Sequence, residues 1–139
     1  MQDEHDFHDV ERALTRLVQE FVWRVDHGLA DQLGELFVDD ARLHGAGLDL
    51  HGRDAIARWG KDRMATARTS RHFCVHTRVD RVEPGRATAI TPFLVFRHDG
   101  TGPGPAVPFG AGDYRDDFVT VSGEWLFSAR HIDMMFVNS

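Results

Sequence analysis

The chain has 139 residues, a length that suits one domain around one hydrophobic core. Its 22 acidic residues outnumber 16 basic ones, which gives a net charge of −6 without a basic stripe, so we expect neither nucleic acid nor an anionic membrane surface as a partner. No apolar run reaches the roughly 18 residues of a membrane span. The single cysteine excludes an internal disulfide, and the acidic start is unlike a secretion signal, which together predict a cytoplasmic location.

The first predicted element is a long amphipathic helix. Apolar residues recur at three- and four-residue spacing over residues 10–25, with Asp9 as the expected N-cap and Gly28 as the stop. Residues 1–7 are expected to form a flexible tail, and residues 8–139 to form a single domain.

Two shorter helices, over residues 31–37 and 53–65, and a short strand at 41–44 complete the first half. The second half has strand composition, with a Gly- and Pro-rich loop at 99–108. The strands predicted there cover residues 69–83, 87–98, 109–121 and 124–137. Helices followed by antiparallel strands indicate an α+β domain, in which three N-terminal helices pack on one curved, mostly antiparallel sheet as a cone with an interior pocket.

Asp26 is unusual because it continues an apolar stripe of the first predicted helix. Leu14, Val18 and Val22 precede it at four-residue intervals, so its carboxylate is placed on the buried face at the helix end. A buried charge is costly unless it is paired or hydrogen-bonded. Either the carboxylate is buried with a partner, or the helix has already ended and Asp26 faces water.

His72 lies early in the first long strand. It shares one strand face with Cys74, His76 and Arg78, and this polar face either meets solvent or lines a pocket. An isolated strand histidine is usually structural or exposed. A buried aspartate beside it would instead fix the tautomer of the imidazole and make it a general base.

The histidines form no recognisable metal site. His72 and His76 would lie about 13 Å apart along a strand, too far to share one ion, and no HExxH sequence is present. Cys74 has no nucleophile motif around it, and the glycines over residues 100–112 do not open a helix as a phosphate-binding loop would. We therefore expect no metal ion and no cofactor.

Arg130, in the last predicted strand, has two interpretations. It forms a salt bridge with Asp116 or Asp117 on the neighbouring strand, or its cation faces the pocket and stabilises negative charge on a leaving group. The pocket wall is expected to bind an apolar substrate, although core packing explains most of its members equally well. The residues expected to form that wall are Val22, Trp23, Phe37, Trp59, Phe93, Tyr114 and Phe127.

Four short sequences occur in order along the chain: LFVDDA, HGRDAIARW, GDYRDDFV and SGEWLFSAR. With the expected order of helices and strands, they make the chain resemble the SnoaL-like members of the nuclear transport factor 2-like superfamily over about residues 8–136. The resemblance implies a cone of three helices against a curved antiparallel sheet. That fold hosts several enzymes and many binding modules, so it does not by itself define a function.

The sequence is most similar to the branch of scytalone dehydratase and hexachlorocyclohexane dehydrochlorinase. Both place an aspartate at the end of the first helix and a histidine early in the first long strand, which here are Asp26 in WRVDHG and His72 in SRHFCVH. The dehydrochlorinase also has an arginine that corresponds to Arg130 in WLFSAR. Phe21 stands where the dehydrochlorinase has a lysine, and Val25 stands where scytalone dehydratase has a tyrosine.

The resemblance implies a cofactor-independent lyase acting on an apolar, ring-containing small molecule. His72 would remove a proton from carbon, Asp26 would hold the ring and stabilise the imidazolium, and the leaving group would depart toward Arg130. The open alternatives are a polyketide cyclase or isomerase of the same fold, and a non-catalytic module for ligand binding or assembly. We expect a homodimer or homotrimer, formed through an apolar strand face made by Phe73, Val75, Val79, Leu94 and Phe96.

Overall fold

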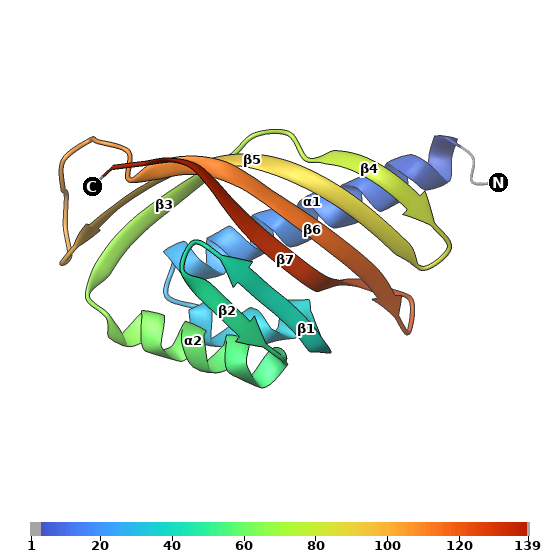
Figure 1. Cartoon of the computed structure of the whole chain (residues 1–139), viewed down its shortest axis with the longest axis horizontal. Coiled ribbons are helices and arrows are strands. Elements are labelled where there is room, and N and C mark those ends of the chain that lie inside the picture. Colours follow the sequence, from blue (N-terminus) through green and yellow to red (C-terminus); the bar gives the residue numbers. More distant parts are fainter. Residues whose placement is uncertain (1–3, 139) are drawn as a thin grey trace.

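The computed structural model describes residues 4–138. In chain order the elements are α1 (Glu4–Asp26), the 3₁₀ helix η1 (Ala30–Leu36), β1 (Phe37–Gly45), β2 (Leu48–His51), α2 (Arg53–Ala65), β3 (Arg68–Cys74), β4 (Arg78–Glu83), β5 (Arg86–Asp99), β6 (Gly110–Val121) and β7 (Glu124–Val137) (Figure 1). No helix in this part of the chain is long and apolar enough to cross a membrane.

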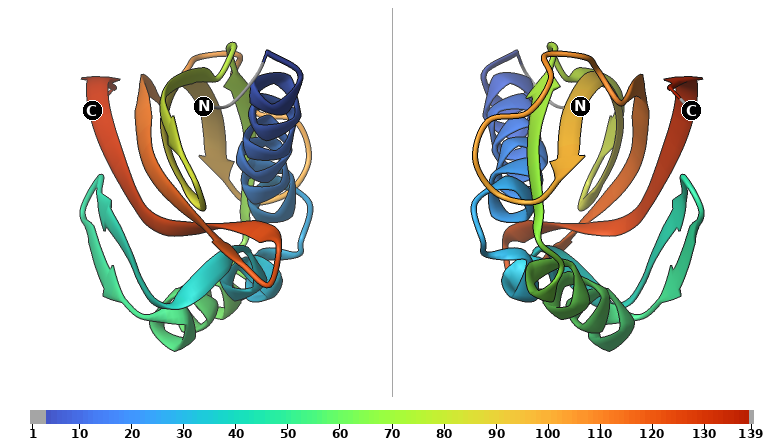
Figure 2. Two further views of the ribbon diagram at one scale, coloured as in Figure 1. Left: turned by 90° about the vertical axis from the view of Figure 1, so that its right-hand side faces the viewer. Right: turned by 90° about the vertical axis from the view of Figure 1, so that its left-hand side faces the viewer.

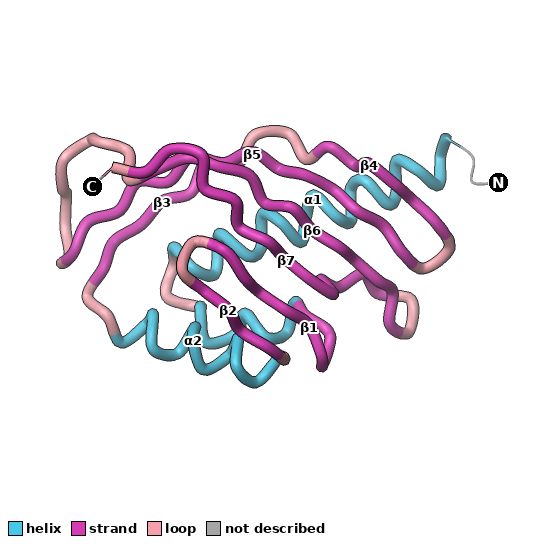
Figure 3. Tube along the Cα trace, viewed as in Figure 1, coloured by secondary structure: helices cyan, strands magenta, loops and turns pink. Residues whose placement is uncertain are grey.

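One sheet holds all the strands, in the order β2-β1-β7-β6-β5-β3, with β4 also paired to β5 (Figure 3). Only β1 and β7 pair in parallel, and the other pairs are antiparallel. Figure 2 shows the sheet strongly curved, with α1 across its open side and α2 with η1 at one end. The α+β class and the cone-like arrangement of three helices on a curved, mostly antiparallel sheet are thereby confirmed.

Helix α1 begins earlier than its apolar pattern predicts. It starts at Glu4, so Asp9 is not its N-cap and residues 4–7 of the expected tail are helical, while residues 1–3 lie outside the described part. No proline or glycine interrupts these residues, and acidic side chains such as Asp6 suit the first turns of a helix. Gly28 does end the helix: it has a φ of 77°, and the next residue, Leu29, donates its N–H to the carbonyl of Arg24 at 3.0 Å.

The strand predicted over residues 69–83 is two strands. Both β3 and β4 pair with β5, and the ladder is interrupted between Cys74, opposite Phe93, and Arg78, opposite Ile90. Pro92 of β5 lies within this gap and has no N–H to donate, which prevents continuous pairing. The strand expected at residues 41–44 is longer than predicted and forms a hairpin with β2, which was not predicted.

The core lies between α1 and the concave face of the sheet. Phe21 of α1 meets the rings of Phe37, Tyr114 and Phe127 edge-on, with centroids 6.1–6.3 Å apart. Such aromatic pairs add to the stabilisation that burial provides. At one end, Gly60 lets α2 approach η1 closely, because a Cβ there would overlap the carbonyl of Ala30. The helices therefore close the cone around an apolar interior with a cluster of aromatic rings at its centre.

Candidate active site

Asp26 is the last residue of α1, and its side chain is only 3% exposed. Oδ1 accepts hydrogen bonds from Ser70 Oγ at 2.7 Å and His72 Nδ1 at 2.8 Å, and Oδ2 accepts the backbone N–H of His72 at 2.7 Å. Burial would raise the pKa of this carboxyl, but the bonds and charge of His72 and the bond from Ser70 outweigh it and hold the pKa below its ordinary value. The buried interpretation of Asp26 is therefore correct, and the alternative of an Asp26 in water is wrong.

His72 presents its ring to a cavity, with its side chain 14% exposed. Because Nδ1 donates to an ionised Asp26, the neutral ring carries its proton there and leaves a lone pair on Nε2. No side chain or main-chain group of residues 6–138 forms a hydrogen bond with Nε2. The structure thus brings together the two residues that the sequence pattern could only place on separate elements.

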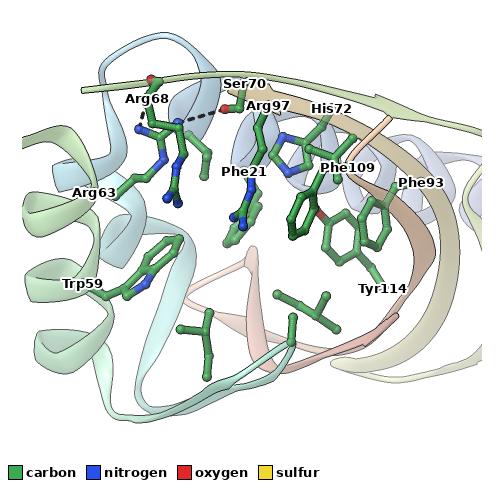
Figure 4. Close-up of a pocket in the computed structure, with 15 residues that line it drawn as sticks. Phe21, Trp59, Arg63, Arg68, Ser70, His72, Phe93, Arg97, Phe109 and Tyr114 are labelled. Atoms are coloured by element: carbon green, nitrogen blue, oxygen red, sulfur yellow. Dashed lines mark hydrogen bonds between the residues drawn. The ribbon is translucent and has the colours of Figure 1, made fainter. Parts of the chain in front are cut away.

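Ser70 extends this pair into a chain of hydrogen bonds that the sequence did not predict. Its hydroxyl donates to Asp26 and accepts from Nη2 of Arg63 at 2.9 Å. Ser70 lies two residues before His72 in β3 and therefore on the same strand face, which is the signal that could have identified it. Arg63, Ser70, Asp26 and His72 form one continuous polar network. Figure 4 shows three of its members, Arg63, Ser70 and His72, at the cavity.

The cavity beside His72 has a volume of about 270 Å³, just below the range of about 300–1,000 Å³ that is typical of small-molecule sites. Three of the expected wall residues, Trp59, Phe93 and Tyr114, line it. Phe93 and Tyr114 stack with centroids 4.2 Å apart. The other lining residues are Phe21, Val25, Ala46, Leu48, Arg63, Arg68, Ser70, His72, Val95, Arg97, Phe109 and Ile132.

Four expected wall residues do not line the cavity, and those predictions are wrong. Val22, Phe37 and Phe127 belong to the buried core, because they pack between α1 and the sheet rather than at the cavity. Trp23 lies on the outer face of α1, 54% exposed, with its ring stacked on His27 at 3.7 Å. Helical spacing alone does not distinguish a side chain in the core from one at the edge of a cavity.

Arg130 does not face the cavity either. It is fully buried in a bidentate salt bridge with Asp116, with Nε–Oδ1 and Nη2–Oδ2 distances of 2.7 and 2.8 Å. The guanidinium carbon lies 3.8 Å from the centroid of Tyr114 and 4.4 Å from that of Phe21, and these two rings line the cavity. The salt-bridge interpretation is therefore confirmed and the pocket-facing one is wrong, because the aromatic rings separate this cation from the cavity.

Three other arginines line the cavity instead: Arg63 of α2, Arg68 of β3 and Arg97 of β5. Arg97 lies directly opposite Ser70 in the β3–β5 ladder, so the two side chains share the inner face of the sheet. None of the three was predicted, because the assignment requires both the position of α2 beside β3 and the register between β3 and β5. Among residues 6–138, no group of three or more histidine, cysteine, aspartate and glutamate side chains is placed to hold a metal ion.

Solved structures with the same fold differ widely in function. A candidate scytalone dehydratase from Novosphingobium aromaticivorans is 23% identical, with a TM-score of 0.78 over 91% of this chain and 85% of its own. LinA is 18% identical, with a TM-score of 0.75 over 94% and 93% of the two chains. The β subunit of a candidate aromatic-ring-hydroxylating dioxygenase, also from N. aromaticivorans, is 19% identical, with a TM-score of 0.76 over 91% and 90%.

These likenesses establish the fold alone, because all three identities are below 25%. No protein of curated function matches the sequence. A family model, that of the SnoaL-like domain, does match residues 8–131, which is most of the chain. With the cone of helices and curved sheet, this match shows that the chain belongs to the SnoaL-like domain family.

Proposed function

We propose that this protein is a cofactor-independent lyase of the dehydratase or dehydrohalogenase type, acting on a small ring-containing molecule. The observation that carries the proposal is the 2.8 Å hydrogen bond between His72 Nδ1 and the buried Asp26 at the wall of a cavity. An imidazole oriented by a carboxylate, with its other nitrogen toward a substrate site, is the arrangement of a general base.

The reaction begins at Nε2 of His72, which takes a proton from a carbon next to an activating group such as a carbonyl. The electron pair of that C–H bond forms the carbon–carbon double bond, and the bond from the neighbouring carbon to its hydroxyl or halide breaks. Asp26 stabilises the imidazolium that forms, since its low pKa keeps it ionised. General-base catalysis of this kind contributes about 10²–10⁴-fold to the rate.

The fate of the leaving group depends on its chemistry. A hydroxyl leaves as water after taking the proton from Nε2, whereas a halide leaves as the anion and the proton passes to solvent. Arg130 is held by Asp116 behind the aromatic rings, so it does not receive the leaving group as the resemblance implied.

The proposal is tested with cyclic β-hydroxy and β-chloro ketones, whose elimination to enones is followed by ultraviolet absorbance. We expect His72→Ala and Asp26→Asn each to lower kcat/KM by at least about 10²-fold. His76→Ala, at a side chain that is 75% exposed in the loop between β3 and β4, is the matched control and should keep its activity. Unchanged turnover in both dyad variants, with their fold verified by circular dichroism, would contradict the proposal.

A polyketide cyclase or isomerase is the second candidate, because the same His72–Asp26 pair can deprotonate carbon for ring closure or double-bond migration. Poly-β-ketone esters distinguish ring closure from elimination: cyclised products without turnover of the β-hydroxy ketones favour the cyclase. A binding or assembly role is the third candidate, supported by the similarity to a dioxygenase β subunit. Saturable ligand binding without turnover of any substrate favours that role.

A further inference from the structure

Three guanidinium groups converge on the end of the cavity nearest α2. Figure 4 shows Arg63, Arg68 and Arg97 on one side of His72, with Phe93 and Tyr114 on the other side. They come from three different elements, α2, β3 and β5. The cavity therefore has a cationic end, an aromatic end and the His72 ring between them.

The positive charge at this end exceeds the negative charge around it. Arg68 pairs with Asp99 at 3.2 Å, but Asp99 is 83% exposed. Arg63 donates to the neutral hydroxyl of Ser70, and the guanidinium of Arg97 lies 3.5 Å from the centroid of the Phe109 ring.

Neither Arg63 nor Arg97 forms an ion pair with any side chain of residues 6–138. The remaining carboxylate nearby, Asp26, is already engaged by His72 and Ser70. Three cations thus face two carboxylates.

Burial and neighbouring charges also affect the pKa values of two of these arginines. Burial and the charge of Arg68 hold the pKa of both Arg63 and Arg97 below its ordinary value, although Asp26 acts in the opposite direction on Arg63 and Asp99 does so on Arg97. Both groups remain protonated at neutral pH, since a guanidinium does not lose its proton in proteins. Repulsion among three cations is relieved by an anion that bridges them.

We propose that Arg63 and Arg97 bind a carboxylate group of the substrate. A guanidinium presents a planar fork of N–H donors that matches a carboxylate in a bidentate arrangement. The aromatic end of the cavity takes the apolar ring, which places the carbons between acid and ring beside His72. This inference rests on the proposed function and narrows its substrate class from a neutral ring to a cyclic or aromatic acid.

The test compares 2-naphthoate with its neutral counterpart 2-naphthamide, which has nearly the same shape. Both are titrated into the full-length protein, and binding is followed by NMR at the indole N–H of Trp59, which lines the cavity. We expect naphthoate to bind at least about tenfold more tightly, and this preference to weaken with added salt. Equal affinities for the two ligands would overturn the proposal.

Variants locate the preference at the two arginines. Arg97→Gln and Arg63→Gln should each weaken naphthoate binding about tenfold and leave naphthamide binding unchanged. Arg58→Gln makes the same charge change at an exposed position of α2 outside the cavity lining, and should bind like the parent. An equal loss in Arg58→Gln would overturn the proposal, because it would show attraction to the overall charge rather than to this site.

One variant separates this proposal from the lyase itself. His72→Gln should abolish elimination and retain the tighter binding of naphthoate. If naphthoate binds more tightly than naphthamide through the two arginines while no elimination substrate is turned over, the carboxylate site is supported and the lyase proposal is contradicted. If elimination depends on His72 while naphthoate and naphthamide bind equally, the lyase proposal is supported and the carboxylate site is contradicted.

Discussion

Asp26 and His72 are joined at two points, because the carboxylate accepts both the ring Nδ1–H and the backbone N–H of His72, at 2.8 and 2.7 Å. The side-chain bond orients the imidazole, whereas the main-chain bond ties β3 to the end of α1. The same carboxylate therefore serves the fold and the proposed reaction. Effects of its substitution on stability and on activity have to be measured separately.

The stability that Asp26 provides should depend on pH. Its folded-state pKa lies below the ordinary value of about 3.9, so the contribution is fully present above that value and is lost as the pH falls through the folded-state pKa. Asp26→Asn should therefore lower the free energy of unfolding by about 1–3 kcal/mol at pH 7, because it leaves buried donors poorly paired.

Urea denaturation of the parent and of Asp26→Asn at about pH 7 and about pH 3 measures this difference in the free energy of unfolding, which should be smaller at the acidic pH. The exposed variant Asp62→Asn is the control and should remain close to the parent at both values. A difference in unfolding free energy that grows on acidification would contradict the lowered pKa of Asp26.

Ser70 should act as a positioning residue. Removing its hydroxyl by Ser70→Ala takes one of three hydrogen bonds from Asp26 and the only side-chain acceptor from Arg63 within the described residues. We expect kcat to fall about tenfold with little change in KM, and stability to fall by about 1 kcal/mol. Ser128→Ala, at a half-buried position of β7 outside the cavity lining, should change neither. A loss of kcat as large as that of Asp26→Asn would place Ser70 in the reaction itself.

The Asp116–Arg130 pair should contribute to folding rather than to chemistry. Burial raises the pKa of Asp116 despite the opposing effect of Arg130, so removing the arginine leaves an uncompensated buried acid. Arg130→Met should destabilise the fold by about 3–5 kcal/mol, and the double variant with Asp116→Asn should recover part of this loss. Denaturation of the single and double variants measures both effects. An Arg130→Met protein of parental stability that has lost turnover would restore the catalytic role that the sequence suggested.

The apolar strand face should mediate self-association. Phe73 and Val75 are 58% and 63% exposed, and Phe73 lies edge-on to Phe96 at 5.9 Å. Exposed apolar clusters of this kind favour protein contacts. We predict a homodimer or homotrimer that dissociates in the double variant Phe73→Ser, Val75→Ser, as measured by light scattering coupled to size exclusion. The exposed Val121→Ser should leave the assembly intact, and a monomeric parent protein would show the prediction to be wrong.

Sequence reasoning placed most elements correctly where the signal was local. The bounds of α2, residues 53–65, and the end of α1 before Gly28 follow from periodicity and a left-handed glycine, both of which depend on neighbouring residues. The break between β3 and β4 was missed, because it depends on Pro92 of the facing strand rather than on the residues that would form the strand.

The residues of the candidate site also differ in whether a local sequence signal could identify them. The apolar stripe and the family resemblance singled out Asp26 and His72. Ser70 was not predicted, although the alternation of β3 puts it on the same strand face as His72. The resemblance gave Arg130 a role at the cavity, but its strand pattern suits a buried salt bridge and a cavity cation equally well, and the structure shows the salt bridge.

By itself the sequence determined the helices and most of the strands, since periodicity and end signals act over a few residues, and its family resemblance singled out the two residues of the proposed dyad. Only the tertiary structure decided that Asp26 contacts His72, that Arg97 lies opposite Ser70, and that Trp23 lies on the outer face of α1 rather than at the cavity. The physical reason is that alternation divides a strand into two faces without saying which one is covered, while register is set by pairing with residues far away in the chain.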